Sequence, residues 1–223
     1  MKDAQATAFS SGEGDRYFER NRSWAAQYDP DADPMVRLLD IVRVEPESVM
    51  EVGAASGHRT AALAQRYGCR SVAVEPSLNA VEEGRRQYPD VEFVVATMDS
   101  IPIDSVFSLV LVSFVFHWVG RSLLLRSVAE VDRLVADGGH LAIGDFFPSG
   151  FAKTPYKHQA GLWTFKQDYA ELFCASGLYT RIASLTGEYG GAIPSGGADP
   201  SQRVRYTLLS KSLDSNYQVV ELD

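Results

Sequence analysis

The chain has 223 residues, a length that suits one α/β domain or one domain with a small cap. Its hydrophobic fraction of 45% can build a core without metal or disulfide staples. The formal net charge of -8 disfavours nucleic acid as a partner, because binding a phosphate backbone needs a basic face; a local basic patch is the alternative.

The cysteine content and the hydropathy favour a cytoplasmic protein. Cys69 and Cys174 are far apart and in no metal-ligand spacing, so we expect two reduced thiols. No apolar stretch approaches the length of a membrane span, and the first residues lack the apolar core of a signal peptide. We therefore expect no membrane partner.

The N-terminal segment is predicted to be largely helical. Residues 1–14 are small and polar and are expected to be mobile. A helix rich in aromatic residues and arginine is predicted over 15–28, followed by a turn with two prolines over 29–34. Pro34 then opens a second helix over 35–44, where apolar residues recur at helical spacing.

From Ser48 onwards, short apolar runs alternate with helical patterns. Ser77 is a good helix N-cap and Gly68 a good helix stop. Strands are predicted over 48–53, 71–76, 91–97, 107–116 and 140–147, and helices over 57–68, 77–89 and 123–139. This alternation indicates βαβ units and a parallel sheet, and the right-handed crossover rule places helices on both faces.

After the fifth strand the pattern changes. Residues 148–166 are irregular and aromatic and are expected to fold over the edge of the sheet, and a helix follows over 167–178. Two strands over 178–189 and 203–213, joined by the loop 190–202 with no helix, indicate a hairpin. We therefore predict an α/β, Rossmann-like, doubly wound sheet of seven strands, mostly parallel, that ends in an antiparallel C-terminal hairpin.

The segment from Glu51 to Gly57 (EVGAASG) leaves the first predicted strand and enters a helix. Ligands of doubly wound sheets bind at this edge, where glycine lets them approach the backbone and the helix dipole faces them. Glu75 ends the second strand 22 residues after Gly53, and a carboxylate there accepts both hydroxyls of a ribose. A plain strand-to-helix turn and a solvated acid before a proline are the structural alternatives.

The choice of nucleoside cofactor depends on the glycines. Nicotinamide cofactors require G-x-G-x-x-G, because their pyrophosphate needs a close backbone approach. Counting from Gly53, Ala55 and His58 stand where the second and third glycines belong. S-adenosylmethionine carries no phosphate and tolerates a small alanine better, so the pattern favours it.

The third predicted strand leads into Thr97-Met98-Asp99. An acid at this place accepts the adenine amino group, while Met98 covers the face of the ring. Asp99 as a helix N-cap is the alternative role.

From Val49 to Phe147 the chain resembles the class I S-adenosylmethionine-dependent methyltransferases. The matching stretches are VMEVGAASG, VAVEPS, ATMDSIP, FSLVLVSFVFHWV and DGGHLAIGDFFP. The resemblance implies the seven-stranded fold with a reversed last hairpin, the methionine part of the cofactor near Glu51 and its loop, the ribose at Glu75 and the adenine at Asp99. The whole expected cofactor site comprises Tyr17, Arg20, Asn21, Glu51, Gly53, Ala54, Ala55, Gly57, Glu75, Pro76, Ser77, Thr97, Met98, Asp99, Ser113 and Phe114.

Two positions depart from this family's usual pattern. Many relatives have glycine in place of Ala55 and an acid in place of Ser108. Ser108 starts the fourth predicted strand, away from the cofactor, so we expect little effect there. Ala55 is expected to tighten the loop.

Two further stretches, GDRYFERN and YKHQAGLWTFKQDYAELF, resemble a bacterial subgroup often found with surface-polysaccharide genes. That resemblance implies that Tyr17, Arg20 and Asn21 cover the methionine end of the cofactor, with Arg20 paired to its carboxylate. An exposed helix with scattered charges is the alternative.

His117 is the first candidate for a catalytic base, because it follows the fourth strand directly and imidazole titrates near neutral pH. A hydrogen-bonded structural histidine is the alternative. Asp145 ends the fifth strand at the same rim, and Tyr156 and His158 lie in the segment expected to cap the site. No close ligand spacing demands a metal, so none is expected.

Together these features predict one methyltransferase domain over 1–223. Its parts are an N-terminal cap over 1–46, a cofactor-binding core over 47–147, and a substrate-side cap, helix and hairpin over 148–223. The expected activity is methyl transfer from S-adenosylmethionine to a small molecule such as a sugar or sugar nucleotide of surface-polysaccharide or secondary metabolism, with S-adenosylhomocysteine as product. A nicotinamide-dependent reductase and a non-catalytic cofactor-binding protein are the alternatives, and a monomer or homodimer is expected.

Overall fold

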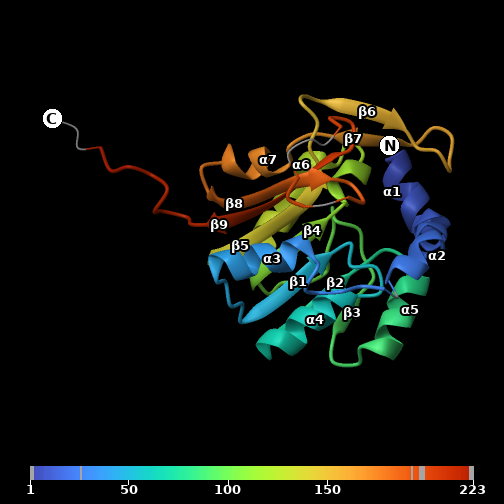
Figure 1. Ribbon diagram of the computed structural model, residues 1–223, viewed down its shortest axis with the longest axis horizontal. Coiled ribbons are helices and arrows are strands. Elements are labelled where there is room, and N and C mark those ends of the chain that lie inside the picture. The colour runs from blue at the N-terminus through green and yellow to red at the C-terminus, as the bar shows by residue number, and fades with distance from the viewer. Residues whose placement is uncertain (1–2, 26, 192, 196–198, 221–223) are drawn as a thin grey trace.

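A seven-stranded sheet runs through the molecule in the order β3-β2-β1-β4-β5-β9-β8 (Figure 1). The computed structural model describes residues 3–25, 27–191, 193–195 and 199–220. The strands of the sheet are β1 (Ser48–Val52), β2 (Arg70–Val74), β3 (Glu92–Val94), β4 (Phe107–Ser113), β5 (Val135–Phe146), β8 (Tyr179–Glu188) and β9 (Arg203–Lys211). β1 to β5 pair in parallel, whereas β9 is antiparallel to both β5 and β8, which confirms the predicted fold.

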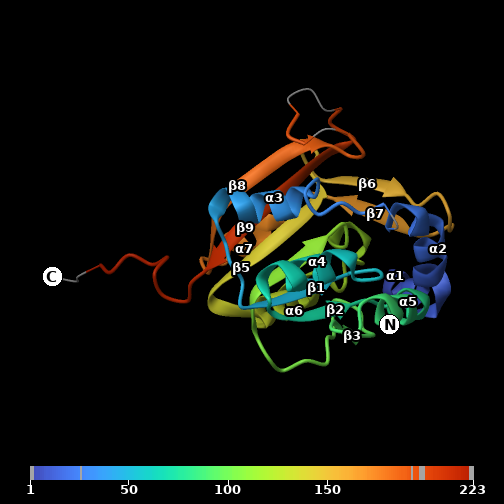
Figure 2. The same cartoon turned by 60° about the horizontal axis from the view of Figure 1, so that its bottom comes forward.

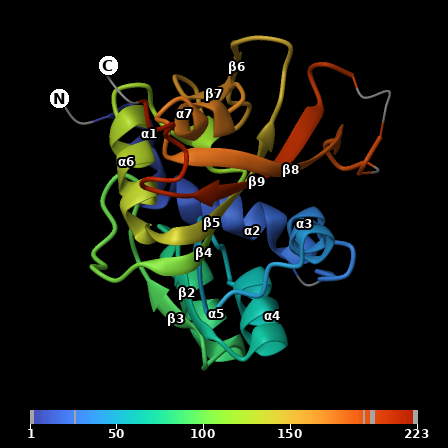
Figure 3. The ribbon, with the colours of Figure 1, turned by 90° about the vertical axis from the view of Figure 1, so that its left-hand side faces the viewer.

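Helices cover both faces of this sheet (Figure 3). One face carries α3 (Pro34–Val42), α4 (His58–Tyr67) and α5 (Leu78–Gln87), and the other carries α6 (Leu124–Leu134) and α7 (Ala170–Cys174). Side chains alternate along each strand, so Val49 packs toward α3 and α4 while Met50 and Val52 pack toward α6 and α7. Burial on both faces explains why these strands are continuous apolar runs.

The local helix signals of the sequence are confirmed at two ends. Ser77 Oγ accepts the backbone N–H of Ala80 at 3.1 Å and so caps the start of α5. Gly68 takes a left-handed conformation, with φ of 60°, where α4 ends.

The predicted helix over 123–139 is too long. α6 ends at Leu134, and Val135 already pairs with Phe107 as the first residue of β5. The end of the helix is set from far away in the sequence, because Lys211 of β9 donates to the carbonyls of Asp132 (2.7 Å) and Val135 (3.1 Å). A basic side chain at this position satisfies carbonyls that have no partner within the helix.

The expectation that residues 1–14 are mobile is wrong for the part that the structure describes. α1 (Ala4–Ala8), a π-helical turn η1 (Phe9–Glu13) and α2 (Gly14–Ala25) follow one another without a gap. Asp3 starts this segment, because its Oδ1 accepts the backbone N–H of Gln5 at 2.9 Å. The predicted helix over 15–28 therefore starts one residue earlier and ends sooner, with residue 26 outside the described ranges.

The stretch 148–166 is more regular than predicted. It contains an antiparallel pair, β6 (Ala152–Pro155) and β7 (Trp163–Lys166). The helix that follows is shorter than the predicted 167–178, since α7 has five residues.

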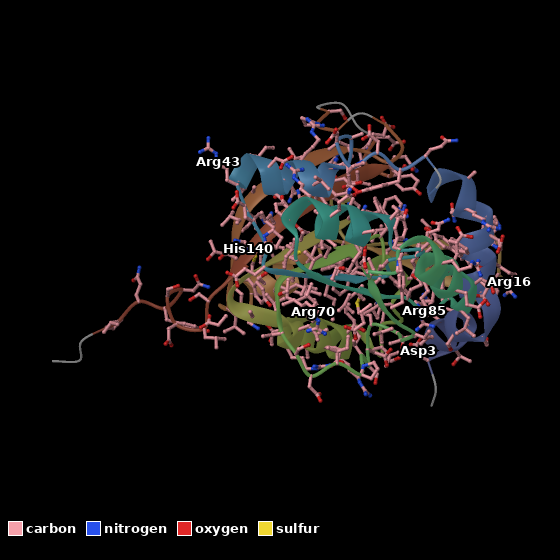
Figure 4. All side chains as sticks on the ribbon, turned by 90° about the horizontal axis from the view of Figure 1, so that it is seen from below. Asp3, Arg16, Arg43, Arg70, Arg85 and His140 are labelled. Carbon is pink, nitrogen blue, oxygen red and sulfur yellow. The ribbon has the colours of Figure 1, made fainter. Side chains whose placement is uncertain are left out.

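The added segments gather at one end of the sheet. Figures 1 and 2 show α1, α2, β6 and β7 together at that end, whereas the C-terminal segment leaves from the other. In Figure 4, Arg43 and His140 mark the end where the strands begin, and Arg16 of α2 lies at the opposite end. The N-terminal helices and the β6–β7 hairpin thus cover the carboxyl ends of the parallel strands. Within the described ranges, no helix has the length and apolar character needed to cross a bilayer.

Candidate active site

The loop after β1 is a tight turn that folds back onto β2. Gly53 has φ of 75°, and a Cβ there would lie 2.2 Å from Val115 Cγ2, so only glycine fits. The backbone N–H groups of Gly53 and Ala54 both donate to the Val74 carbonyl, at 2.8 and 3.1 Å. Ala55 follows with φ of 49°, a left-handed conformation in a residue that carries a Cβ.

Glu75 joins the first two loops. Its Oε2 accepts the N–H of Ala55 and its Oε1 accepts the N–H of Ser77, both at 2.9 Å. Burial raises the pKa of Glu75 to about 7, although the two N–H groups pull it down. A carboxylate has about four lone-pair sites, so it can accept two ribose hydroxyls besides these two bonds.

The start of α4 is also suited to a ligand. Gly57 is its N-cap and provides no side-chain hydrogen bond to the first helical turn. The N–H groups of that turn are therefore open to a polar group of a bound molecule. Together with Glu75, this uncapped turn fits a nucleoside cofactor with a polar amino-acid end.

Glu51 lies beneath the loop and is 2% exposed. Its carboxylate forms an ion pair with Arg59 and accepts the Thr60 hydroxyl at 2.7 Å. Arg59 Nε in turn donates to Asp33 Oδ2 at 2.7 Å. Burial raises the pKa of Glu51, and Arg59 opposes that rise. These contacts tie the loop after β1 to the residue that caps α3.

The loops after β3 and β4 follow the carboxyl ends of their strands, and the structure excludes the alternative role of Asp99. Asp99 does not cap a helix, because none starts there; its carbonyl accepts Arg126 Nε at 2.9 Å. Met98 is buried in the core on the α6 side. Phe114 has φ of 56°, and its N–H donates to the Gly144 carbonyl at 2.7 Å. A bulky residue in this conformation is a strained position of the kind found at functional sites.

The N-terminal helices are held against this end of the sheet by polar contacts. Asp15 Oδ1 accepts the Ser77 hydroxyl at 2.6 Å, so Ser77 serves both the cap of α5 and this contact. Glu13 accepts Arg20 Nη2 and the Tyr156 hydroxyl, each at 2.6 Å. The structure thus gives Arg20 a protein carboxylate as its partner.

Tyr17 and Asn21 of the same helix differ in position. Tyr17 faces Trp118, with ring centroids 6.0 Å apart, and burial raises the pKa of its hydroxyl to about 12. Asn21 is exposed, and its amide donates to the Tyr17 carbonyl at 2.8 Å within the helix. Asn21 therefore matches the alternative of an exposed helix surface.

His117 and Asp145 form a buried pair between the ends of β4 and β5. Nδ1 of His117 lies 2.9 Å from Oδ1 of Asp145, and the two side chains are each 4% exposed. The ring N–H is not well aligned with that oxygen, so the contact has the distance but not the direction of a hydrogen bond. Asp145 is itself fixed, because its carboxylate accepts the N–H of Phe146 at 2.7 Å and of His117 at 3.2 Å.

An aromatic wall surrounds this pair; we use the term for Tyr17, Phe114, Trp118, Phe146 and Tyr189. The His117 ring lies 4.7 Å from Trp118 and 5.1 Å from Phe146, measured between centroids. Tyr189 closes one side at 5.2 Å from Phe146. These side chains present apolar faces next to a buried imidazole and carboxylate.

Tyr156 and His158 lie outside the pair. The Tyr156 ring packs on Trp118 with a centroid distance of 4.6 Å, and its hydroxyl is engaged by Glu13. His158 is exposed beyond Tyr156, at 5.3 Å between ring centroids. Among the described residues, no group of three His, Cys, Asp or Glu side chains is arranged to hold a metal ion.

Several residues at the site were not predicted from the sequence. Glu13, Asp15, Arg59 and Lys166 all contact predicted site residues or the aromatic wall. Arg59 lies eight residues from Glu51, whereas the partners of the other three are distant in the chain, and no local motif distinguishes the four from ordinary surface charges.

Known proteins are similar in sequence to the central part of the chain. A family described as "Methyltransferase domain" matches residues 50–143. Malonyl-[acyl-carrier protein] O-methyltransferase of Geobacter sulfurreducens is 29% identical over 150 residues, which are 62% of this chain and 55% of that protein. The chain spans about half the length of the curated relatives it matches.

Solved structures share the fold at low sequence identity. The 1,6-didemethyltoxoflavin-N1-methyltransferase of Burkholderia thailandensis, bound to S-adenosylhomocysteine, has a TM-score of 0.71 at 14% identity, over 95% of this chain and 92% of that chain. An amino pentose methyltransferase of Micromonospora echinaspora has a TM-score of 0.62 at 14% identity, over 87% and 96%. The matched segment contains the loop after β1, Glu75 and the His117 region. Residues 50–143 therefore match a methyltransferase-domain family, and the sheet has the same fold as solved methyltransferases.

Proposed function

We propose that the protein transfers a methyl group from S-adenosylmethionine to a small-molecule acceptor, with His117 as the general base. The observation that carries this proposal is the buried His117–Asp145 pair, 2.9 Å apart, beside the cofactor loop. When bound, the cofactor supplies an electrophilic methyl group, and the acceptor must present a nucleophile in line with it.

The pair is suited to removing a proton from the acceptor. Asp145 holds the Nδ1 side of the imidazole, which leaves Nε2 to accept the proton. Within the described part of the chain, Nε2 has no hydrogen-bond partner from the protein. Asp145 also stabilises the imidazolium that forms. The small reorientation needed to align the Nδ1 proton with Asp145 is ordinary for a site without substrate.

We also propose which residues of these loops bind each part of the cofactor. We assign the ribose to Glu75, whose remaining lone pairs adjoin the loop after β1. The adenine is assigned to Met98 and Asp99, and the amino-acid end to the open first turn of α4 and to Tyr17. Arg20 is assigned a positioning role through Glu13, in place of the predicted contact with the cofactor carboxylate.

For the acceptor, we infer a hydroxyl or amine of a sugar or similar small molecule. The amino pentose substrate named for one structural neighbour supports this inference, as does the need of a weakly nucleophilic hydroxyl for a base. The net charge of -8 argues against nucleic acid as the acceptor.

Calorimetry with S-adenosylmethionine and S-adenosylhomocysteine tests the first half of the proposal. We expect both to bind, and the absence of binding at about 1 mM ligand contradicts it. The second half is tested by the release of S-adenosylhomocysteine with a panel of amino sugars and sugar nucleotides. With an acceptor found there, His117→Gln should lower kcat by about 10²- to 10⁴-fold while cofactor affinity stays unchanged. Unchanged turnover removes His117 from the mechanism.

A further inference from the structure

Lys166, the last residue of β7, reaches the aromatic wall from the hairpin side. Its Nζ lies 3.7 Å from the centroid of the Phe146 ring and donates to the Ser201 carbonyl at 3.3 Å. The residue is half-buried. It is therefore an ammonium group placed on an aromatic face next to the β8–β9 loop.

Among the residues that the structure describes, no carboxylate forms an ion pair with Lys166. Its polar partner in the described part of the chain is a neutral carbonyl, and Asp145 acts on it from a longer distance. Burial lowers the pKa of Lys166, with Asp145 opposing that shift. By contrast, the neighbouring Arg205 lies over Phe147 and is already paired with Asp168 at 3.0 Å.

Phe146 links this cation to the catalytic pair. The same ring that receives Lys166 lies 5.1 Å from the His117 ring and 5.2 Å from the Tyr189 ring, measured between centroids. One benzene ring thus separates the ammonium from the imidazole. A molecule that reaches from one to the other needs only the size of a monosaccharide or a single substituted ring.

We propose that Lys166 binds a negatively charged group of the acceptor, a carboxylate or a phosphate, while the nucleophilic atom of the acceptor faces His117. An ammonium has three N–H donors. Lys166 uses one of them on the Ser201 carbonyl, and its ammonium lies over the face of the Phe146 ring, so a donor remains for an anion. Because the site is partly desolvated, such a pair is stronger than one on the open surface. This inference rests on the proposed function and narrows its acceptor to an anionic small molecule.

The ordinary alternative is a lysine that packs its stem on an aromatic residue and leaves its charge in water. The two accounts differ in one measurable respect. An anion site distinguishes an anionic ring compound from its neutral isostere, whereas a packed surface lysine does not.

Benzoate, phenyl phosphate and neutral benzamide serve as probes, titrated calorimetrically into the protein with and without S-adenosylhomocysteine. We expect at least one anion to bind about tenfold or more tightly than benzamide, with the preferred anion telling carboxylate from phosphate. Lys166→Met should abolish that preference. Lys157→Met, which removes an exposed lysine of the same hairpin, is the matched control and should keep it.

The proposal is overturned if neither anion binds more tightly than benzamide, or if Lys166→Met keeps the preference. Binding of S-adenosylhomocysteine to both variants is measured in parallel. A wild-type protein that does not bind S-adenosylhomocysteine counts against the proposed methyltransferase function. A protein that binds S-adenosylhomocysteine but shows no preference for anions counts only against the proposed role of Lys166.

Discussion

The backbone N–H of Ala55 donates to Glu75 Oε2 at 2.9 Å, so the acid after β2 fixes the strained residue of the loop after β1. The other carboxylate oxygen accepts the N–H of Ser77 at 2.9 Å and fixes the start of α5. The side chain of Glu75 therefore fixes the conformation of both loops when no ligand is bound. The contact also joins a strained backbone to a carboxyl group of raised pKa.

Cofactor binding should depend on pH through Glu75. Its pKa of about 7 lies above the ordinary 4.5, so the folded protein without ligand holds a proton that the unfolded chain has lost between these values. The contribution of Glu75 to the free energy of unfolding is therefore fully present below about pH 4.5 and is lost as the pH rises through about 7.

For ligand binding, the ionised carboxylate of Glu75 is the better acceptor for ribose hydroxyls. Affinity for S-adenosylhomocysteine, measured by calorimetry, should thus increase as the pH rises through about 7.

Glu75→Gln removes that dependence. We expect affinity to fall by about 10- to 100-fold, the cost of weakening hydrogen bonds to a charged acceptor, and to become flat with pH. Glu82→Gln, an exposed acid on α5, is the control and should behave like the wild type. A Glu75→Gln protein that keeps the pH dependence rules out this carboxylate as its source.

Ala55→Gly should stabilise the fold. The left-handed φ of 49° costs an L-residue about 1 kcal/mol or more, and glycine adopts it freely. Ala54→Gly is the matched control at the adjacent position, which has no left-handed backbone; glycine there should destabilise by about 0.5–1 kcal/mol. Urea unfolding of both variants measures the difference. Equal destabilisation by both would show that the loop is not strained at Ala55.

The sequence was most informative where a signal and its structural effect lie close together in the chain. Gly53, Glu75 and the cap at Ser77 were all predicted from local spacing, and the doubly wound sheet that brings them together was predicted from the alternation of strands and helices. The end of α6 was not, because Lys211 caps it from 76 residues away. A long-range contact of this kind leaves no pattern in the segment that it shapes.

The candidate site likewise contains residues that local patterns predicted and residues that only long-range contacts bring together. His117 and Asp145 were predicted as separate residues at the carboxyl ends of two strands, and the parallel pairing of β4 and β5 explains why they meet. Glu13 and Tyr156 are 143 residues apart, and only the fold joins them. The hydroxyl of Tyr156, a catalytic candidate from its position in the sequence, donates to Glu13.

Asp145→Asn should reduce turnover without unfolding the protein. An asparagine of the same shape keeps the backbone contact with Phe146 only in part and no longer stabilises an imidazolium at His117. We expect kcat to fall by about 10²- to 10⁴-fold with little change in cofactor affinity. Asp90→Asn is the control, because Asp90 is exposed and outside the pair, and its turnover should be close to that of the wild type. Comparable losses in both variants would place the base elsewhere.

Glu13 should control how firmly the N-terminal helices close over the site. Its side chain is 1% exposed and accepts Arg16, Arg20 and Tyr156. Burial tends to raise the pKa of Glu13, but hydrogen bonds from Tyr156, Arg20 and Arg16 outweigh it and lower the pKa below 4.5. The stabilisation is therefore present at neutral pH and is lost as the pH falls through the lowered pKa.

Glu13→Gln keeps the shape and removes the charge. Hydrogen exchange at pH 7 should become faster in α1 and α2 and stay unchanged in the central strands, because local opening affects only the segment whose contacts are weakened. Glu19→Gln removes an exposed charge from α2, where the pair with Arg22 spans 3.7 Å, and should leave exchange unaltered. If both variants exchange alike, the buried contact does not hold the helices, and their closure depends on other contacts such as Asp15 with Ser77.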